Sequence, residues 1–511
     1  MIAFRPFLAS AVTVTDWGVI VLYALGMVAV GLYYGKRTRG TEDYLLGGRR
    51  MKPLAVGLSL FASLLSTISY LGYTGEMIQY GPMYIAGIIV FPLVIFLVGW
   101  FMIPRFMELR VTSAYEILEQ KLGRSIRLLG AFFFISLRLL WMAVIIFATT
   151  DKVLVPLMGL SPSWTPAVCA VMGIVTIVYT SLGGLRAVVF TDVVQSGILF
   201  GGALLTVTLI TKQLGGIDAW WPQQWPGHWP ALQWGYDPEA RMTFVGVLLS
   251  VFFWHTCTAG SDQIAIQRYF ATRDAASARR VLGTNLLVNV LAMALMGVVG
   301  LALIGAYTAD PSVFDGDGDQ VSLTENADQL FPRYIANGLP VGITGLVIAG
   351  LLAAAMSSLS SGMSAASSVI TAEIFREKRS KALDENAGIR IARWTSLGIG
   401  IAVLGLSLVV NQVEGNLFKV TNKVVNLFVS PLFVLFFLAM FVKRSNAAGT
   451  WVGAAASVTV AVLIAFWEEL TGSNGISFLW IMPAGFVSGV GVGVLASVVF
   501  RPRRNQKNED P

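Results

Sequence analysis

Charged residues, cysteines and histidines are all scarce in this 511-residue chain, and only 13% of its residues are charged. Cys169 and Cys257 both lie in apolar runs, so we expect neither a disulfide framework nor closely spaced metal-binding cysteines. His228 lies in a predicted loop and His255 in a predicted span, and neither belongs to a nucleophile or metal cluster, which argues against an enzyme. The first 16 residues lack the basic and long apolar regions of a signal peptide, so we expect no cleaved signal.

Apolar residues, in contrast, make up 55% of the chain, and its mean hydropathy is +0.70. This composition is typical of a polytopic helical membrane protein, and no polar stretch is long enough for a separate soluble domain. Because a membrane span needs about 20 apolar residues, we expect thirteen spans. They lie at about 16–35, 53–79, 83–105, 124–156, 164–182, 187–212, 242–261, 280–308, 340–372, 388–411, 417–442, 447–468 and 477–500.

Basic residues are concentrated in alternate loops between these spans. They occur within 36–52, 105–127, 186, 268–280, 376–381, 443–444 and 501–504. The positive-inside rule places these segments in the cytoplasm. We therefore expect a multi-pass protein of the cell membrane with an extracellular N-terminus, a cytoplasmic C-terminus and an odd number of spans.

Two loops on the opposite side carry suggestive patterns. Residues 315–319 begin like a calcium-binding loop, but Gln320 and Asn326 stand where such a loop requires glycine and glutamate. We interpret this segment, and the wider loop 310–328, as a solvated acidic loop. The segment 220–234 is rich in tryptophan and proline, which favours an interfacial aromatic belt over a platform that stacks sugars.

The most unusual span contains four hydroxyls within five positions, from Ser357 to Ser361. Ser357, Ser360 and Ser361 are spaced by three and four residues, so their hydroxyls share one helix face. Hydroxyls are hard oxygen ligands and, with carbonyls from a neighbouring segment, can replace the hydration shell of a small cation. The alternative is close helix packing by small residues.

The second span is also rich in hydroxyls, and Gly72 and Gly75 allow its helix to break. A break frees backbone carbonyls, which membrane proteins tolerate only beside a cavity or packed protein. Such carbonyls are natural partners for the serine cluster. A hydroxyl-rich packing face is an equal alternative.

Among the ionisable side chains inside predicted spans, we single out Asp192, Arg138 and His255 as candidates for function. Asp192 is a candidate ion ligand or, because it follows Thr191, a helix N-cap. Arg138 is a candidate to bind a carboxylate or else extends to the cytoplasmic surface. His255 is a candidate ligand or proton carrier, although a single buried histidine is more often a structural hydrogen-bonding residue.

Four spaced motifs resemble those of the sodium:solute symporter family, which includes transporters of glucose, proline and sialic acid. The motifs are Tyr179-Thr180-Ser181-Leu182-Gly183-Gly184-Leu185-Arg186-Ala187, Val188-Val189-Phe190-Thr191-Asp192-Val193-Val194-Gln195, Asp262-Gln263 with Gln267-Arg268-Tyr269, and the serine cluster. The resemblance extends over nearly the whole chain.

This resemblance implies an all-α polytopic membrane protein of about 13 transmembrane helices, with the inverted five-helix repeats of the leucine transporter fold. The implied divisions are an N-terminus, first helix and basic loop (1–52), a first repeat (53–212), a Trp-rich extracellular loop (213–241), a second repeat (242–442), two C-terminal helices (443–500) and a basic cytoplasmic tail (501–511). The broken helix that opens each repeat would form the central site.

The resemblance also implies two sodium sites. The first would use the carbonyls of Ala62, Leu65 and Ala354 and the hydroxyls of Ser357 and Ser358. The second, which resembles a site of the sialic acid transporters, would use Asp192, Ser357, Ser360 and Ser361. We therefore expect Asp192→Asn to weaken sodium dependence in a protein that still folds.

The implied solute pocket is matched less fully. Its candidates are Ser66, Ser69, Arg138, His255 and Asn426. The carboxylate-binding arginine of the sialic acid transporters corresponds to Met142, one turn after Arg138, and Ala259 lies where sugar transporters place a stacking aromatic. The solute class therefore stays open among sugars, sialic acids and other carboxylates.

The implied function is the import of a small organic solute by alternating access, with Na+ as the co-transported ion and no organic cofactor. We expect the lipid bilayer as surroundings, no nucleic acid and no obligate protein partner. Two alternatives remain. One is a transporter coupled to protons through Asp192 or His255, and the other is a transporter-like solute sensor, for which the tail after Phe500 is short.

Overall fold

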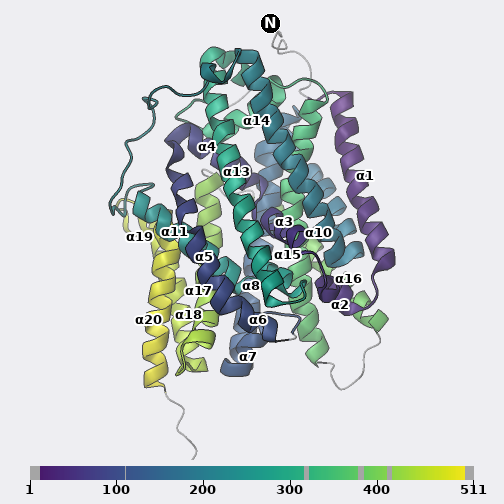
Figure 1. Ribbon diagram of the computed structural model, residues 1–511, viewed down its shortest axis with the longest axis vertical. Coiled ribbons are helices and arrows are strands. Elements are labelled where there is room, and N and C mark those ends of the chain that lie inside the picture. The colour runs from purple at the N-terminus through teal and green to yellow at the C-terminus, as the bar shows by residue number, and fades with distance from the viewer. Residues whose placement is uncertain (1–11, 110, 316–320, 378–384, 411–416, 501–511) are drawn as a thin grey trace, which may run out of the picture.

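The structure, a computed structural model, describes residues 12–109, 111–315, 321–377, 385–410 and 417–500. These residues form helices and connecting segments, with no strand among them (Figure 1). Several residues of the charge pattern lie outside the described part. They are Arg110, Asp317, Asp319, Lys378, Arg379, Lys381 and the basic tail from Arg501.

Helices account for most of the described chain. They are α1 (Val14–Arg37), α2 (Thr41–Leu46), α3 (Pro53–Leu64), α4 (Thr67–Tyr80), α5 (Phe91–Leu97), α6 (Ile103–Glu108), α7 (Glu116–Leu122), α8 (Arg124–Thr149), α9 (Val155–Leu157), α10 (Thr165–Leu214), α11 (Phe244–Ser261), α12 (Gln263–Phe270), α13 (Ala275–Ala309), α14 (Leu330–Asn337), α15 (Ile343–Glu377), α16 (Glu385–Ser407), α17 (Leu417–Phe441), α18 (Ala447–Ala465), α19 (Trp467–Thr471) and α20 (Ile481–Val499). Short 3-10 and π segments continue several of them, such as η2 (Pro82–Val90) before α5 and η4 (Thr150–Leu154) after α8.

Each of the thirteen predicted spans overlaps a helix of the structure. By length and composition, ten helical segments of the described residues could cross a membrane, or up to eleven with the bent pair α3 and α4. The chain is therefore a multi-pass membrane protein, and the count of thirteen stays a prediction.

The fifth and sixth predicted spans form one continuous helix, α10, which reverses direction at Gly184 (φ 62°, ψ −167°). Its first leg runs beside α1 in the same direction. The second leg runs antiparallel to α1. The later α1 residue Tyr34 contacts the earlier α10 residue Phe190, with ring centroids 5.8 Å apart, whereas the earlier Tyr23 accepts a 2.8 Å hydrogen bond from the later Gln195. The two legs are thus a helical hairpin, as the two separate predicted spans require.

The second predicted span is broken, with a bend of 71° between α3 and α4. The break lies at Leu65 and Ser66, whose backbones are extended, and not at Gly72 or Gly75, so that prediction was wrong. The reason is local, because the hydroxyl of Ser66 accepts a hydrogen bond from the Ser69 backbone N–H and caps the new helix. Both glycines lie inside α4.

The seventh predicted span is followed by a similar break. Helix α11 ends at Ser261, and α12 begins after Asp262, whose backbone is extended and whose carboxylate accepts a 2.8 Å hydrogen bond from the Ile264 N–H. Helix α15 lies at the centre of the bundle, since 89% of its most apolar window is buried. The two breaks and α15 therefore approach one another in the interior (Figure 1).

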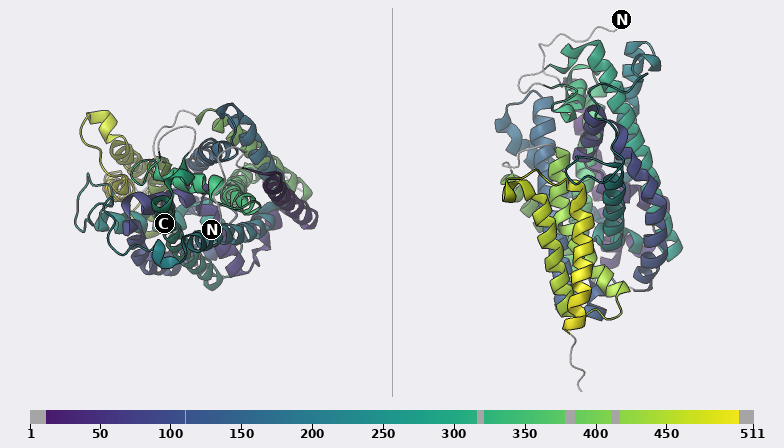
Figure 2. Two further views of the ribbon diagram at one scale, coloured as in Figure 1. Left: turned by 90° about the horizontal axis from the view of Figure 1, so that it is seen from above. Right: turned by 90° about the vertical axis from the view of Figure 1, so that its left-hand side faces the viewer.

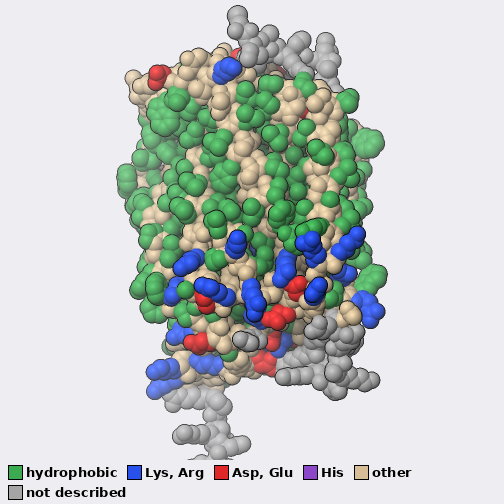
Figure 3. Space-filling view, turned by 45° about the vertical axis from the view of Figure 1, so that its right-hand side comes forward, with side chains coloured by type: hydrophobic (Ala, Val, Ile, Leu, Met, Phe, Trp, Pro, Cys, Tyr) green, Lys and Arg blue, Asp and Glu red, His purple; other side chains and the backbone are tan. Residues whose placement is uncertain are grey.

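The two C-terminal spans, α18 and α20, pack against each other and against α17 at one side of the bundle (Figure 2). Glycines allow this contact, because a Cβ on Gly453 would lie 2.6 Å from the carbonyl oxygen of Gly489. Basic side chains gather toward the end of the molecule remote from the N-terminus (Figure 3). The wide band between the two ends is largely apolar, as a surface within lipid should be.

Candidate functional site

All five groups predicted for the first sodium site come together at the break between α3 and α4. The Ser357 hydroxyl donates hydrogen bonds to the carbonyl oxygens of Ala62 (2.9 Å) and Ala354 (3.0 Å). The Ser358 hydroxyl donates to the carbonyl of Leu65 at 3.4 Å. The break supplies two of these carbonyls, because α3 ends at Leu64 and its last carbonyls have no helical partner.

A small cavity of about 10 Å³ lies beside these oxygens, room for about one water-sized particle. Ala62, Leu65, Ala354 and Ser357 all contribute to its lining, and Gln195 and Ser196 of α10 complete it. Three carbonyls and two hydroxyls are a neutral, all-oxygen donor set. Such a set fits a hard monovalent cation and offers none of the nitrogen or sulfur ligands that transition metals prefer.

Asp192 lies in the interior of the second leg of α10, so it is not the N-cap that the sequence also allowed. Its side chain is fully buried. One carboxylate oxygen, Oδ2, accepts hydrogen bonds from Ser59 (2.6 Å) and Ser361 (3.3 Å). The other, Oδ1, is buried without a hydrogen-bond partner among the described residues. An unpartnered buried carboxylate oxygen is costly in a protein interior, and a bound cation would satisfy it.

The other members of the second predicted sodium site lie on the same part of α15. Ser361 also accepts a 2.7 Å hydrogen bond from Ser63 of α3, which links the site to the broken helix. Ser360 donates to the Ser357 carbonyl at 3.1 Å, so its hydroxyl is turned along the helix. Of the three serines that the prediction grouped with Asp192, only Ser361 forms a hydrogen bond with it in the described part of the structure.

Arg268 is a member of this cluster that the sequence analysis missed. Its guanidinium donates to Ser361 at 2.5 Å and lies 3.6 Å from Asp192 Oδ2, and both side chains of the ion pair have no exposed surface. We had counted Arg268 among the basic residues of a cytoplasmic loop, which was wrong. The sequence signal that could have identified Arg268 was its position in the family-like motif Gln267-Arg268-Tyr269, because a basic residue that only faces solvent in a loop does not require particular neighbours.

The solute candidates Ser66 and Ser69 lie at the start of α4. Their hydroxyls are 3.4 Å apart, and Ser66 is engaged as the helix cap. Helix α17, which carries Asn426, packs against both α4 and α11. The amide oxygen of Asn426 is buried and has no hydrogen-bond partner among the described residues. A buried amide oxygen without a partner is available to accept a hydrogen bond from a polar ligand.

Arg138 is buried and forms an ion pair with Asp262, the residue at the break between α11 and α12. It therefore does not extend to the cytoplasmic surface, which removes one of its two interpretations. Met142, one turn further along α8, is buried against α15, where its sulfur lies 2.6 Å from the position of a Cβ on Gly362. The positive group that could face a carboxylate is thus already paired within the protein.

His255 lies in α11 among aromatic rings. Its ring centroid is 4.6 Å from those of both Phe91 and Trp254, and the side chain is buried. These contacts are aromatic packing, and His255 forms no hydrogen bond among the described residues, so the expected hydrogen-bonding role stays a prediction. The structure thus brings the five solute candidates onto neighbouring helices, but it joins only Ser66 and Ser69 by a direct contact.

The Trp-rich loop covers the C-terminal end of α4. The side chains of His228 and Trp229 both reach the carbonyl oxygen of Ile78, at 2.8 and 2.9 Å. Trp220 and Trp229 are buried, so for these two the predicted interfacial belt is wrong, because they pack on protein. Arg241, at the end of the same loop, forms an ion pair with the buried Glu76 of α4.

Comparison with known sequences gives matches over almost the entire chain. The profile of the sodium:solute symporter family matches residues 44–456. A sodium/sialic acid symporter of Proteus mirabilis is 29% identical over 97% of this chain and 97% of that protein. A sodium/sialic acid symporter of Aliivibrio fischeri is 27% identical, with 96% and 94% covered, and a sodium/glucose cotransporter of Vibrio parahaemolyticus is 25% identical, with 88% and 85% covered.

Solved structures agree with these matches. A substrate-bound, outward-open Na+-coupled sialic acid symporter, in which a novel Na+ site was found, has a TM-score of 0.80 at 26% identity, with 96% of this chain and 98% of that chain covered. Mhp1, a nucleobase-cation-symport-1 transporter, has a TM-score of 0.53 at 12% identity, with 89% and 94% covered, and shows the shared fold alone. The fold is therefore that of the leucine transporter group, as predicted.

A sodium:solute symporter moves a small solute across the membrane together with sodium and performs no covalent chemistry on it. The family profile matches far more than half of the chain, and it includes the break in the second span, the Asp192 leg of α10 and the serine cluster. This match establishes sodium-coupled solute symport and sets the protein apart from enzymes. The chain belongs to the sodium:solute symporter family.

Proposed function

We propose that this symporter imports an acidic sugar of the sialic acid class, or a related small carboxylate, together with two sodium ions. The observation that carries the sodium part is the gathering of five oxygens from Ala62, Leu65, Ala354, Ser357 and Ser358 at the helix break. Three of these oxygens come from α15, one from α3 and one from the break after α3, so they meet only when these segments are assembled. Sodium bound there would hold the broken helix against α15.

The second proposed sodium ion binds Asp192 Oδ1 together with Ser360 and Ser361. Its support is the buried oxygen without a partner, beside hydroxyls on the facing helix. Arg268 neutralises the same carboxylate through Oδ2. Sodium therefore joins an existing ion pair, and Oδ1 offers it a buried carboxylate oxygen that has no other partner among the described residues.

The solute class rests on the two sodium/sialic acid symporters that match nearly the full chain. In our proposal the solute lies against Ser66, Ser69, His255 and Asn426. Arg138 binds its carboxylate when the contact with Asp262 opens. A bidentate arginine is well suited to a carboxylate, and the displaced Asp262 keeps its cap on α12.

We further propose the orientation and the divisions of the chain. The basic end of the molecule faces the cytoplasm, by the positive-inside rule, which leaves the N-terminus and the loop 213–241 outside. The two inverted repeats are 53–212 and 242–442, and each begins with a broken helix. Sodium entering from outside would order the first break and complete the solute site before the bundle opens inward.

The test is solute uptake by the full chain reconstituted into liposomes. Radiolabelled N-acetylneuraminic acid, glucose and pyruvate would each be supplied with an inward sodium gradient, an inward proton gradient or neither. We expect uptake of the sialic acid with the sodium gradient only. Equal uptake in a proton gradient would establish the proton-coupled alternative, and sodium-dependent uptake of glucose or pyruvate alone would refute the proposed solute class.

If no uptake is observed, a second measurement is needed, because a solute sensor would bind the solute without transporting it. Thermal stability in detergent, with and without sodium and each solute, supplies it. Stabilisation by a solute that depends on sodium, without any uptake, would favour the sensor. The absence of any response to sodium would contradict both proposed ion sites.

A further inference from the structure

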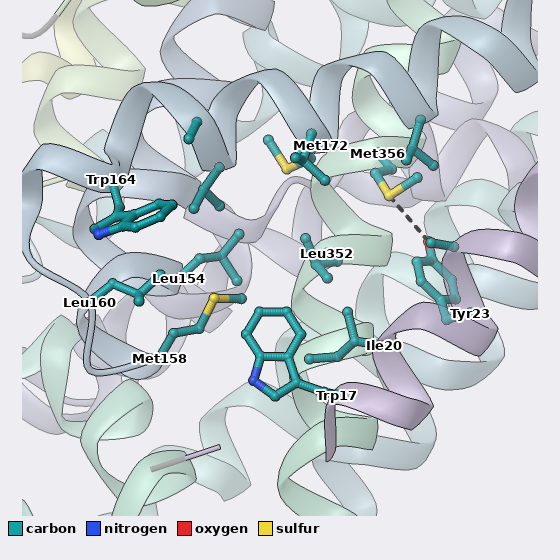
Figure 4. A pocket seen from close by; sticks show the side chains of 15 residues that line it. Trp17, Ile20, Tyr23, Leu154, Met158, Leu160, Trp164, Met172, Leu352 and Met356 are labelled. Carbon is teal, nitrogen blue, oxygen red and sulfur yellow. Dashed lines mark hydrogen bonds between the residues drawn. The ribbon is translucent and has the colours of Figure 1, made fainter. Parts of the chain in front are cut away.

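A second cavity lies at the edge of the bundle, between α1, the first leg of α10 and α15 (Figure 4). Its volume is about 370 Å³, within the range of about 300–1,000 Å³ that small-molecule pockets occupy. The connection from η4 through α9 closes one end with Leu154 and Met158. None of the proposed sodium ligands or solute contacts lines this cavity, so it is separate from the transport site.

The lining of this cavity is apolar throughout. Its side chains are aliphatic, aromatic or methionine, and Figure 4 shows Trp17, Met158 and Leu352 facing the same space. The one hydroxyl, on Tyr23, is occupied elsewhere. It accepts a 2.8 Å hydrogen bond from Gln195 and lies 3.7 Å from the sulfur of Met356. A polar solute would therefore lose its hydration in this cavity without gaining a hydrogen bond.

The cavity is continuous with the surface that faces lipid. Helix α1 is peripheral, with only 22% of its apolar window buried. Among the side chains that line the cavity, Ile20 and Tyr23 are buried, whereas Trp17, Trp164 and Val171 are exposed and mark its open side. Trp17 and Trp164, both at helix starts, stand at the rim with 42% and 55% of their surface exposed. Tryptophan at a span end is typical of the boundary between headgroups and acyl chains.

We propose that this cavity binds one acyl chain of a membrane phospholipid, which enters between Trp17 and Trp164 and ends against Leu352 and Met356. The occupant is fixed by three observations, namely the apolar lining, the opening toward lipid and the tryptophans at headgroup level. The deep end matters for the transporter, because Met356 directly precedes Ser357 of the first sodium site. The inference does not depend on which solute is carried.

Photo-crosslinking in liposomes tests this assignment. The full chain would be reconstituted in palmitoyl-oleoyl-phosphatidylcholine containing a small fraction of phosphatidylcholine with a diazirine near the end of one acyl chain. Crosslinked residues would then be mapped by mass spectrometry. We expect crosslinks to Leu352 and Met356, which are 9% and 2% exposed and which lipid at the outer surface does not reach.

The matched variants are Ala24→Phe, which fills the cavity from α1, and Ala29→Phe, which places the same ring on the exposed side of the same helix. Ala24→Phe should reduce crosslinking to α15 by about ten-fold, which corresponds to about 1.4 kcal/mol of lost affinity. Ala29→Phe should leave it unchanged. If Ala24→Phe does not fold, Ala167→Phe fills the same cavity from α10.

Crosslinks confined to exposed residues outside the cavity, such as Val21 and Leu22 of α1, with none on Leu352 or Met356, would overturn the proposal. Equal crosslinking of α15 in Ala24→Phe and Ala29→Phe would do the same. The crosslinking is carried out without sodium or solute, so either result can be distinguished from a failure of the proposed transport function.

Discussion

At the residue scale, the sites depend on a few oxygens whose partners come from distant parts of the chain. The spacing of Ser357, Ser360 and Ser361 and the buried position of Asp192 could be predicted, because helix periodicity and an acid inside an apolar run are visible in the sequence. Arg268 could not be assigned in the same way. Hydropathy and charge near a span end are the same whether a cation faces solvent or an internal carboxylate, so apart from its motif only the fold identifies the partner of Arg268.

Ser357→Ala should weaken sodium binding at the first site. The substitution removes the hydroxyl that contacts both Ala62 and Ala354. A hydrogen-bonding group that serves a charge contributes about 1.5–3 kcal/mol, so the sodium concentration for half-maximal uptake should rise roughly ten-fold or more. The control is Ser367→Ala on the same helix, whose hydroxyl donates to Ala392 at 2.9 Å, away from the break. Equal sodium dependence of the two variants would contradict the site.

Asp192→Asn should lower stability as well as sodium dependence, because it leaves the Arg268 charge buried without its partner. Removing one member of a buried ion pair costs about 3–5 kcal/mol, whereas replacing both members is often nearly neutral. We therefore expect a large drop in melting temperature for Asp192→Asn and substantial recovery in the double variant Asp192→Asn with Arg268→Gln. The structure thus changes the expectation that Asp192→Asn leaves the fold intact.

Sodium activation gives the second measurement on these variants. The double variant should fold and yet lose one sodium ion, so the Hill coefficient for sodium should fall from about two toward one. A double variant that is no more stable than Asp192→Asn would show that the ion pair is not what the single substitution breaks. A Hill coefficient that stays unchanged would remove the second sodium site.

At the element scale, the breaks in the helices decide where the sites form. The sequence predicted that the second span breaks, and the structure confirms it, but the position was wrong because glycine was taken as the signal. Ser66 provides the break by capping α4, and a serine inside a hydroxyl-rich span gives no unique signal for a cap. The two legs of the α10 hairpin were predicted as the separate spans 164–182 and 187–212, because the apolar run is too long for one crossing.

Gly184→Ala should disrupt the hairpin of α10. Gly184 has a φ of 62°, and a Cβ there would lie 2.7 Å from both the carbonyl oxygen and the ring of Tyr44. A strained residue of this kind costs about 1–3 kcal/mol, and the steric overlap adds to it. The melting temperature of the purified protein should fall, while Gly197→Ala, where nothing lies within 4 Å, should be neutral or slightly stabilising. Equal stability of the two variants would refute this role of Gly184.

At the scale of the whole molecule, composition predicted a multi-pass helical membrane protein, and the resemblance of its motifs to those of the sodium:solute symporters implied the leucine transporter fold. A chain with this hydropathy has to bury its backbone in helices within the bilayer, so each predicted span overlaps a helix. The exact side-chain partners of the loops were not predictable. Trp229, for example, is buried on the end of α4 because the loop folds over the protein, a contact between residues about 150 positions apart.

The proposed orientation predicts which loops are accessible from outside. Gln224→Cys, in the exposed Trp-rich loop, should react with a membrane-impermeant maleimide in intact cells. Arg39→Cys, in the exposed basic segment after α1, should react only after permeabilisation. The native Cys169 and Cys257 are buried, so they give little background. The opposite pattern of labelling would invert the orientation.

Two ion pairs lie inside the bundle, one between Asp192 and Arg268 and one between Arg138 and Asp262. Each pair has a net charge of zero. The bundle without sodium therefore carries no net charge on these residues when it turns from one face of the membrane to the other. The membrane potential does about 2.3 kcal/mol of work per 100 mV on each charge that crosses. The membrane potential consequently drives the step in which the sodium-loaded protein changes conformation. The rate at which the unloaded protein returns should depend little on the potential. Depolarisation of the cell would therefore slow the inward movement of sodium and solute, while the return of the unloaded protein would keep the same rate.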